Sequence, residues 1–352
     1  MLSGVPQGSS LGPLLFLTLI ADINDCLITS TATSFADDTR LLAKIQNNLH
    51  CINLQNDLIN IYKWAQTNNM KFNCKKFELM SYSAPLRNLE TFANHEYPYP
   101  MYFVEDGSLI QSVDCVKDLG VIMESSATFA GQVSKAAKKG SQMAGWVLRV
   151  FATREKLPLL TLFKSIVLPH LEYCCQVWSP VQAGHIQTLE AVLRSYTYRI
   201  SGMQSENYWE RLKALNIFSL ERRRERYFII YAYKVITGTV TNINSEKYAV
   251  KTINNDRRGR LCLVPALNPR ALSSVKSKIE ASFPVRAPRL FNCLPSEIRN
   301  FSGSLETFKN KLDKFLAKIP DKPTMSGYHQ SAASNGLIDQ LAVLRADGVY
   351  FN

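Results

Sequence analysis

The stretch Phe35-Ala36-Asp37-Asp38-Thr39 sets two neighbouring carboxylates between two short segments rich in Thr, Phe, Leu and Ile. The flanking segments, residues 29–35 and 39–45, predict two strands joined by a tight hairpin turn. Adjacent carboxylates repel each other, so the turn favours a bound counter-charge. Mg²⁺ is suitable because it binds carboxylate oxygens and keeps positions open for phosphate. Aspartate is also a common turn residue, so the pair alone is compatible with a plain surface turn.

Upstream of this turn, residues 3–16 read SGVPQGSSLGPLLF, a Gly/Pro/Ser loop that leads into an apolar helix. The helix is predicted to be buried and to run to about Asp25, with Pro13 in its first turn, where a missing N–H costs nothing. The apolar run over 11–21 is about half the length that spans a bilayer, and no basic residue precedes Arg40. We therefore expect no signal peptide or transmembrane helix, and an intracellular protein of the nucleus or cytoplasm. Residues 8–12 match G-x-S-x-G, but Pro6 excludes the strand that must precede a hydrolase elbow.

Downstream of the turn, the spacing of apolar residues predicts a mixed front and a long helical middle. The predicted elements are an amphipathic helix over 48–68, a strand over 70–83 with a turn near Cys74-Lys75-Lys76, a β segment over 115–123, helices from about 129 to 238, short strands and loops over 240–304, and a basic amphipathic helix over 305–319. The chain after Pro320 is polar and is predicted to be a loose tail. Aromatic residues of the helical middle, Trp146 and Tyr173 among them, are interpreted as core packing.

The 352-residue chain carries a formal net charge of +12 that is unevenly divided. Residues 1–130 hold 8 Lys and Arg against 13 Asp and Glu, a net of −5, so residues 131–352 carry +17. A basic rear predicts a polyanionic partner such as nucleic acid, although a solvated basic face would give the same charge. The candidate nucleic-acid-binding residues are Lys135, Lys138 and Lys139 on a predicted helix and Arg257, Arg258 and Arg260 in a predicted loop.

A second basic run, Arg222-Arg223-Arg224-Glu225-Arg226, lies within a predicted helix. Such a run can contact phosphate or act as a nuclear-import patch. Glu221 and Glu225 nevertheless supply partners on the same helix, so a solvated helix face is the favoured interpretation. The eight cysteines are scattered without CxxC pairs or zinc spacing, which indicates reduced thiols in an intracellular protein.

The motifs, in their order and spacing, resemble those of non-LTR (LINE-type, jockey/CR1-like) retrotransposon reverse transcriptases. Residues 3–16 are similar to motif B, 35–39 to motif C and 119–121 to motif E, while motif D is matched by Trp64, Asn69-Met70-Lys71-Phe72-Asn73, Lys76 and Met80. A looser resemblance covers residues 146–180, with Leu168-Pro169-His170-Leu171-Glu172-Tyr173 and Val177-Trp178-Ser179-Pro180, and residues 283–295. It implies an α+β fold, with a truncated right-hand polymerase palm over 1–125, a helical thumb-like region over 126–240, a small mixed, basic C-terminal domain over 241–320 and the loose tail over 321–352.

The resemblance also implies RNA-directed DNA polymerisation, with an RNA template, a DNA primer and dNTP as partners. Asp37 and Asp38 would be the motif C carboxylates that hold Mg²⁺, of which the complete family enzyme binds two ions. Lys76 would be the motif D lysine that neutralises or protonates the leaving pyrophosphate, with a solvated turn lysine as the equal alternative. The residues that would line the substrate pocket are Gly4, Pro6, Gln7, Gly8 and Ser9.

One departure from the family pattern affects the expected activity. Another metal-binding aspartate of the family belongs to motif A, upstream of motif B, and the chain starts two residues before Ser3. We therefore expect a C-terminal fragment that begins at motif B. Phosphoryl transfer depends on positioning and charge stabilisation, so this fragment is expected to be inactive alone. Two other hypotheses stay open, a non-catalytic nucleic-acid-binding protein derived from the element and a relic without selected function. The sequence does not indicate the oligomeric state.

Overall fold

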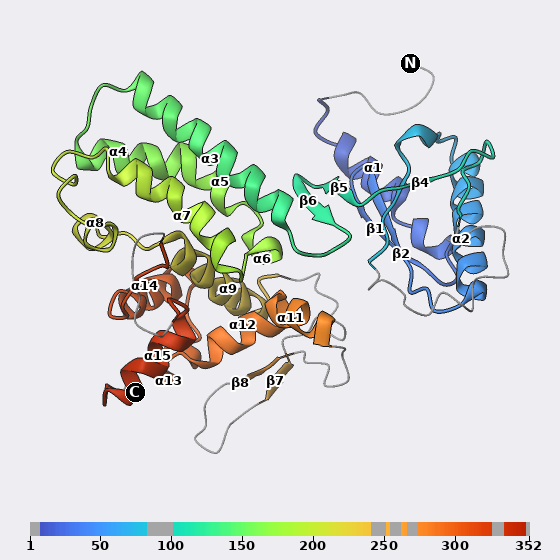
Figure 1. The fold of residues 1–352 in the computed structure, drawn as a ribbon. Helices are drawn as coiled ribbons and strands as arrows, with labels where there is room; N and C mark the ends of the chain where they lie inside the picture. Colours follow the sequence, from blue (N-terminus) through green and yellow to red (C-terminus); the bar gives the residue numbers. More distant parts are fainter. Residues whose placement is uncertain are drawn as a thin grey trace. The chain divides into compact units, whose positions relative to one another are not determined.

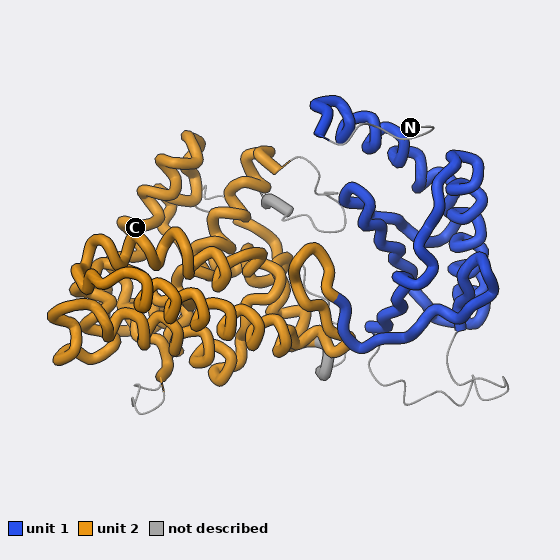
Figure 2. Tube along the Cα trace, turned by 90° about the horizontal axis from the view of Figure 1, so that it is seen from above, with its two compact units in different colours: residues 1–116 blue, residues 117–352 orange. Residues whose placement is uncertain are grey.

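A computed structural model describes residues 8–82, 101–240, 251–253, 262–265, 273–325 and 334–349. The chain divides into two compact units, residues 1–116 and 117–352 (Figure 2). Helices and short strands are mixed along the chain (Figure 1), in agreement with the expected α+β fold class. Every sheet formed by the described residues has two strands.

The first unit is built around a β-hairpin and one long helix. Its elements are α1 (Gly12–Ile20), the 3₁₀ helix η1 (Ile23–Cys26), β1 (Thr31–Phe35), β2 (Asp38–Leu42), α2 (Asn48–Thr67), the 3₁₀ helix η2 (Cys74–Lys76), β3 (Glu78–Leu79) and β4 (Gln111–Ser112). The predicted hairpin and amphipathic helix are both confirmed. Leu58 and Tyr62 of α2 pack with Tyr102, Val104 and Ile110 in a small core.

The apolar helix α1 differs from its prediction because most of it is not buried. Within the described residues only Gly12 and Ile20 of this helix are buried. Leu14, Leu15 and Leu17 are each more than half exposed. An apolar run shows that a helix can be buried, but the neighbours that would bury it come from elsewhere in the chain or from a partner.

The second unit begins with a hairpin and is otherwise mainly helical. Its elements are β5 (Cys115–Asp118), which crosses the unit boundary, β6 (Val121–Glu124), α3 (Ala130–Val150), α4 (Lys156–Leu162), the π-helical turn η4 (Phe163–Val167), α5 (Leu168–Glu172), α6 (Cys175–Trp178), α7 (Ala183–Thr197), α8 (Tyr208–Leu215), α9 (Leu220–Ile236), β7 (Lys251–Ile253), β8 (Cys262–Val264), α11 (Ser273–Ala281), α12 (Phe283–Asn292), α13 (Ser296–Arg299), α14 (Leu305–Leu316) and α15 (Leu337–Ala346). The helices expected between 129 and 238 and over 305–319 are confirmed. The segment 240–304, expected as strands and loops, contains three helices after residue 272.

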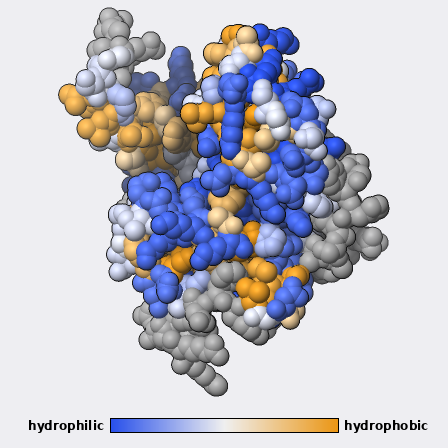
Figure 3. Space-filling view, turned by 90° about the vertical axis from the view of Figure 1, so that its left-hand side faces the viewer, coloured by the Kyte–Doolittle hydropathy of each residue, from blue (hydrophilic) through white to orange (hydrophobic). Residues whose placement is uncertain are grey.

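Two hydrophobic cores lie within this unit. The first joins α3, the π-helical turn, α5 and α7. Gly140 permits the close approach of α3 to α5, because a Cβ there would lie 2.6 Å from Leu171 Cδ2. The second core joins α9, α12, α14 and α15 through Phe228, Phe291, Phe308 and Leu341. On the face drawn in Figure 3, hydrophilic side chains cover most of the coloured surface and hydrophobic ones gather in separate patches.

The basic run of α9 is buried, which corrects the interpretation of a solvated face. Arg222 is 0% exposed and Arg224 is 1% exposed. Arg223 binds Glu172 of α5 through two nitrogens, and Arg226 binds Asp313 of α14 in the same bidentate manner. The partners of Arg223 and Arg226 therefore come from other helices, so the spacing of charges in the sequence could not identify them. Glu225 does pair within α9, as expected, because its Oε2 lies 3.7 Å from Arg222 Nε.

The described residues after Pro320, which are 321–325 and 334–349, include several that bind the N-terminal part of α9, which differs from the expectation of a loose tail. Asp321 accepts hydrogen bonds from the backbone N and the Oγ of Ser219, both at 2.7 Å. Asn335 Nδ2 donates to Glu221 Oε2 at 2.9 Å, and Leu337 N donates to Glu225 Oε1 at 2.9 Å. Arg222 Nη2 donates to the carbonyls of Pro320 and Asn335. These contacts attach the described residues around α15 to α9.

We predict that Asn335→Ala lowers the free energy of unfolding by about 2 kcal/mol, because it leaves buried carboxylate oxygens without their donor. Chemical denaturation of the full chain measures this change. Asn310→Ala, at an exposed position of α14, is the matched control and should change stability by less than about 0.5 kcal/mol. Equal stability of the two variants would contradict the role assigned to the segment after Pro320.

Glu190 of α7 is a fully buried carboxyl group beside α9. Its Oε2 accepts from Tyr208 OH and its Oε1 accepts from Glu221 N, both at 2.7 Å. Burial raises the pKa of Glu190 to about 7, against the opposing effects of Arg224 and of the Tyr208 hydrogen bond. The folded state therefore holds this proton more tightly than the unfolded chain does.

The raised pKa of Glu190 gives a pH-dependent stability term. Its contribution is fully present below the unfolded pKa of about 4.5 and is lost as the pH rises through about 7. We predict that Glu190→Gln, which cannot ionise, gains stability relative to the wild type by about 1–3 kcal/mol between pH 5 and pH 8. Thermal unfolding of both proteins across this range measures the difference. A difference that does not change with pH would refute the assignment.

Candidate functional site

The two adjacent aspartates lie at the tip of the β1–β2 hairpin. Phe35 pairs with Asp38, so Ala36 and Asp37 form a two-residue turn, and Ala36 adopts the left-handed backbone with φ 51°. Both carboxylates are exposed. Within the described part of the chain, no residue forms a hydrogen bond or ion pair with either carboxylate. The hairpin therefore presents two like charges whose oxygens remain free to bind a cation.

A buried carboxylate positions this hairpin. Asp57 of α2 accepts hydrogen bonds from the backbone N of Ile28, Thr29 and Ser30 and from the hydroxyls of Thr29 and Ser30, at 2.7–3.0 Å. Burial raises the pKa of Asp57, but these hydrogen bonds outweigh burial and leave the pKa below its ordinary value. Asn24 of η1 also holds the hairpin in place, because its Oδ1 accepts a hydrogen bond from the backbone N of Ala32 in β1. This role of Asp57 could not be predicted from local sequence, because its partners lie 27 to 29 residues away along the chain.

The aspartate pair fits part of a magnesium site. Mg²⁺ is commonly held by one or two carboxylates together with waters and substrate phosphates, and an exposed Asp pair without internal donors supplies such oxygens. Within the described residues, no group of three or more His, Cys, Asp or Glu side chains is placed to hold a metal. Asp37 and Asp38 therefore supply two ligands rather than a complete cage.

The residues predicted to line a substrate pocket are only partly described. Gly4, Pro6 and Gln7 lie outside the described residues. Gly8 is exposed with φ 82°, and Ser9 Oγ accepts from Gly12 N at 3.1 Å, so its side chain caps the start of α1. Lys76 is exposed at the end of η2. No contact among the described residues joins Lys76 to the aspartates.

The basic residues expected on α3 divide into two groups. Lys135 Nζ donates to Gly120 O at 2.9 Å, and Tyr173 OH donates to the neighbouring Leu119 O at the same distance. Lys135 therefore helps to fix the turn between β5 and β6. Lys138 and Lys139 are exposed. The other three candidates, Arg257, Arg258 and Arg260, lie outside the described residues.

Two aromatic residues interpreted as core packing lie at the surface instead. Trp146 of α3 is 41% exposed, although one edge of its ring system meets the ring of Phe151 with centroids 6.2 Å apart. Tyr173 is 54% exposed. Helical spacing alone could not separate a partly covered ring from a buried one.

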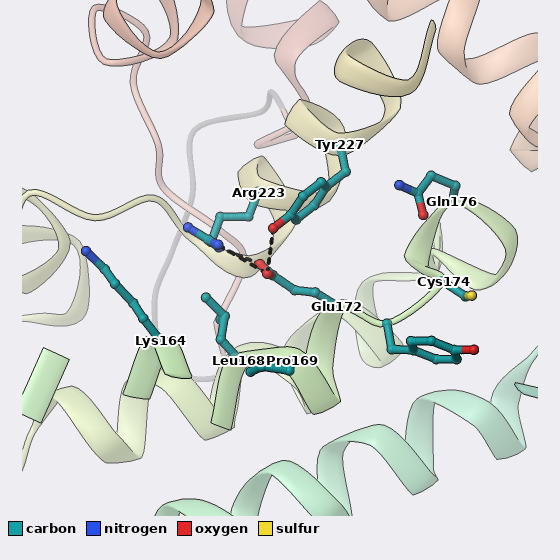
Figure 4. A pocket seen from close by; sticks show the side chains of 9 residues that line it. Lys164, Leu168, Pro169, Glu172, Cys174, Gln176, Arg223 and Tyr227 are labelled. Carbon is teal, nitrogen blue, oxygen red and sulfur yellow. Dashed lines mark hydrogen bonds and ion pairs between the residues drawn. The ribbon is translucent and has the colours of Figure 1, made fainter. Parts of the chain in front are cut away.

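A cleft of about 500 Å³ lies between the segment 164–176 and α9. The lining residues are Lys164, Leu168, Pro169, Glu172, Tyr173, Cys174, Gln176, Arg223 and Tyr227 (Figure 4). Glu172 points toward Arg223 and Tyr227, and its oxygens accept from both. Most of the lining residues belong to the segment 146–180, which the sequence analysis related to the family only by a looser resemblance and to which it assigned no role.

Comparison with known proteins identifies the class of the first unit's sequence. Residues 2–123 match the family described as reverse transcriptase (RNA-dependent DNA polymerase). This range includes the Asp37-Asp38 hairpin and ends at Met123 in β6. The matched segment is therefore a reverse transcriptase domain sequence, as the motifs predicted.

The individual relatives place this domain more closely. The chain is 28% identical over 215 residues to the RNA-directed DNA polymerase from mobile element jockey of Drosophila melanogaster. It is 25% identical over 210 residues to the "Probable RNA-directed DNA polymerase from transposon X-element" of the same organism. Each alignment covers 57% of this chain and 22% of the relative. The reverse transcriptase domain is thus homologous to those of non-LTR retrotransposons, and the chain spans about a fifth of the length of these relatives.

No solved structure matches the chain. Among the residues that the structure describes, no helix is both long enough and apolar enough to cross a membrane.

We predict that Lys135 acts on stability and that Lys138 and Lys139 act on nucleic-acid binding. Lys135→Ala should lower the free energy of unfolding by about 1 kcal/mol through loss of its hydrogen bond to Gly120. Lys138→Ala and Lys139→Ala should each change the free energy of unfolding by less than about 0.5 kcal/mol. Each should nevertheless weaken RNA binding, and should lower the slope of log K against log salt concentration by the value of about one phosphate contact. Chemical denaturation measures the change in stability, and fluorescence anisotropy of a labelled RNA measures the change in binding. RNA binding by Lys138→Ala and Lys139→Ala equal to that of the wild type would contradict the assignment.

Proposed function

We propose that this chain supplies the motif C carboxylates and a nucleic-acid-binding region to RNA-directed DNA polymerisation by a non-LTR retrotransposon. The observation that carries the proposal is the exposed Asp37-Asp38 pair, which lies at a hairpin tip within the reverse transcriptase match and has no hydrogen-bond or ion-pair partner among the described residues. A surface turn under no functional constraint would gain by pairing or replacing one of two repelling carboxylates.

In this proposal, each part of the chain binds a different part of the substrate complex. Asp37 and Asp38 direct their oxygens at Mg²⁺, which would neutralise the phosphates of a dNTP. The loop over residues 4–9 lines the nucleotide pocket, and the exposed Lys76 neutralises the leaving pyrophosphate. Lys138, Lys139 and the arginines at 257, 258 and 260 contact the RNA template and the DNA primer. The remaining oxygens around the metal come from water and phosphate.

We also propose that the chain by itself does not polymerise. Two-metal phosphoryl transfer needs carboxylates that hold both ions about 3.5–4 Å apart. The described residues place no third acidic, His or Cys side chain with Asp37 and Asp38. Two exposed ligands hold an ion weakly and do not fix the distance between two ions, so the reacting groups would not be positioned.

We predict that Mn²⁺, used as a paramagnetic probe for Mg²⁺, binds the full chain weakly and that Asp37→Asn with Asp38→Asn lowers this affinity by about tenfold or more. Electron paramagnetic resonance of free Mn²⁺ measures the affinity. Asp106→Asn is the matched control, because Asp106 is an exposed acid of the same unit that already accepts from Ser108. Equal affinities in the wild type and the double variant would exclude the metal role. In a primer-extension assay with the same proteins, templated dNTP incorporation that is lost in Asp37→Ala would refute the proposed inactivity while supporting the polymerase assignment.

A further inference from the structure

The cleft between residues 164–176 and α9 has the size and the lining of a small-ligand site. Its volume of about 500 Å³ falls within the range of ligand pockets in proteins. Leu168 and Pro169 give it an apolar wall, Tyr227 gives it an aromatic ring, and Gln176 gives it an amide that can both donate and accept. Lys164 and Gln176 extend from different helical segments, with Glu172 between them in the view of Figure 4.

The backbone of the segment 164–176 departs from regular α-helix at two points beside the cleft. Lys164 belongs to the π-helical turn, a form that is rare and often found at functional sites. Cys174 adopts a left-handed conformation with φ 52°, which costs about 1–2 kcal/mol for a residue with a side chain. Trp178 Nε1 holds this turn by donating to Tyr173 O at 2.7 Å. The turn leaves Tyr173 at the surface while Cys175 and Trp178 enter the core.

Among the residues that the structure describes, the charged groups at the cleft leave Lys164 without an acidic partner. Glu172 accepts from Arg223 Nε at 2.5 Å, from Arg223 Nη2 at 3.1 Å and from Tyr227 OH at 3.0 Å. Burial lowers the pKa of Arg223, but the hydrogen bond and charge of Glu172 outweigh this and raise it, so Arg223 stays charged. Glu172 and Arg223 neutralise each other. Within the described residues, no acidic group pairs with Lys164, which is exposed at the edge of the cleft.

We propose that this cleft binds one nucleotide unit of a single-stranded nucleic acid, an inference that rests on the proposed nucleic-acid function of the chain. The base lies against Leu168, Pro169 and the ring of Tyr227, and its edge bonds with the Gln176 amide. The phosphate lies at the Lys164 ammonium. A base of a duplex is stacked and paired, so only an unpaired strand can place a base in a cleft of this size.

The lining distinguishes this ligand from other anions. A free phosphate or an acidic side chain would use Lys164 but not the apolar wall and the ring. A nucleotide uses all of them, because it joins a flat apolar face and polar edge to a phosphate. The cleft is also open to the surface at Lys164, Pro169 and Tyr173, so the strand can continue on either side.

Fluorescence anisotropy of the full chain with a labelled 12-nucleotide oligouridine RNA tests the proposal. Lys164→Ala and Gln176→Ala should each weaken binding by about fivefold or more, with Lys164→Ala also reducing the salt slope by about 0.7, the value for one contact to a single strand. Lys314→Ala, which removes an exposed lysine from α14, is the matched control and should bind like the wild type. A labelled RNA hairpin duplex should bind the two cleft variants and the wild type equally.

The outcomes separate this inference from the proposed function. If the wild type binds neither RNA, the nucleic-acid function and the cleft assignment are both overturned. If the wild type binds RNA but the cleft variants match Lys314→Ala, only the cleft assignment is overturned. If polyglutamate displaces the oligouridine from the wild type as strongly as unlabelled RNA does, the cleft prefers an acidic peptide and the nucleotide assignment is overturned. Circular dichroism of each variant checks that the substitution leaves the fold intact.

Discussion

A guanidinium group removed from water is costly unless carboxylates or carbonyls lie beside it, and this constraint organises the second unit around α9. Arg222 and Arg224 are buried near the start of the helix, and Glu221 and Glu225 are buried beside them. Arg222 donates to the carbonyls of Pro320 and Asn335, and Glu225 accepts from the backbone N of Leu337 at the start of α15. The η nitrogens of Arg224 have no hydrogen-bond partner among the described residues, and its charge interacts favourably with Glu190 of α7. Arg223 and Arg226 extend the same principle to α5 and α14. One helix thus fixes the relative positions of both hydrophobic cores.

The first unit uses a buried charge in the same way and leaves two others free. Asp57 is enclosed by five donors from the segment before β1, which fixes the base of the hairpin. Asp37 and Asp38 at its tip have no such donors within the described residues. A rigid hairpin base with such carboxylates at the tip suits a ligand-binding role. The oxygens of Asp37 and Asp38 are held in position, yet they form no hydrogen bonds with other described residues that would compete with a ligand. The cleft beside Glu172 has a related arrangement. The Glu172 carboxylate already accepts hydrogen bonds from Arg223 and Tyr227, so Lys164 is the residue of the cleft whose charge can bind a ligand.

The features predicted from sequence are those set by neighbouring residues. Strand propensity and turn chemistry gave the hairpin at Asp37, and apolar periodicity gave α2, the helices from α3 to α9, and α14. The motif order indicated the reverse transcriptase class and the aspartate pair. Long-range partners accounted for the failures: the exposure of α1, the burial of Arg222 and the folding of α15 each depend on which distant segment lies nearby. For the same reason, the hydrogen bond from Lys135 to Gly120 was not predicted. The cleft was not predicted either, because it forms where α9 packs beside a segment some 50 residues away.

The attachment of Asp321, Asn335 and Leu337 to α9 has a consequence for the order of events during synthesis. Ribosomes release α9 roughly a hundred residues before Asp321, Asn335 and Leu337 have been made, and domains begin to fold while the chain is still growing. Until these later residues emerge, Ser219, Arg222, Glu221 and Glu225 lack the partners that let them leave water. The helices around α9 can collapse on their apolar faces during that interval, but their charged ends must stay hydrated. The second unit therefore completes its packing only at a late stage of translation, and an arrest before residue 321 would leave a polypeptide that chaperones or proteases could still recognise.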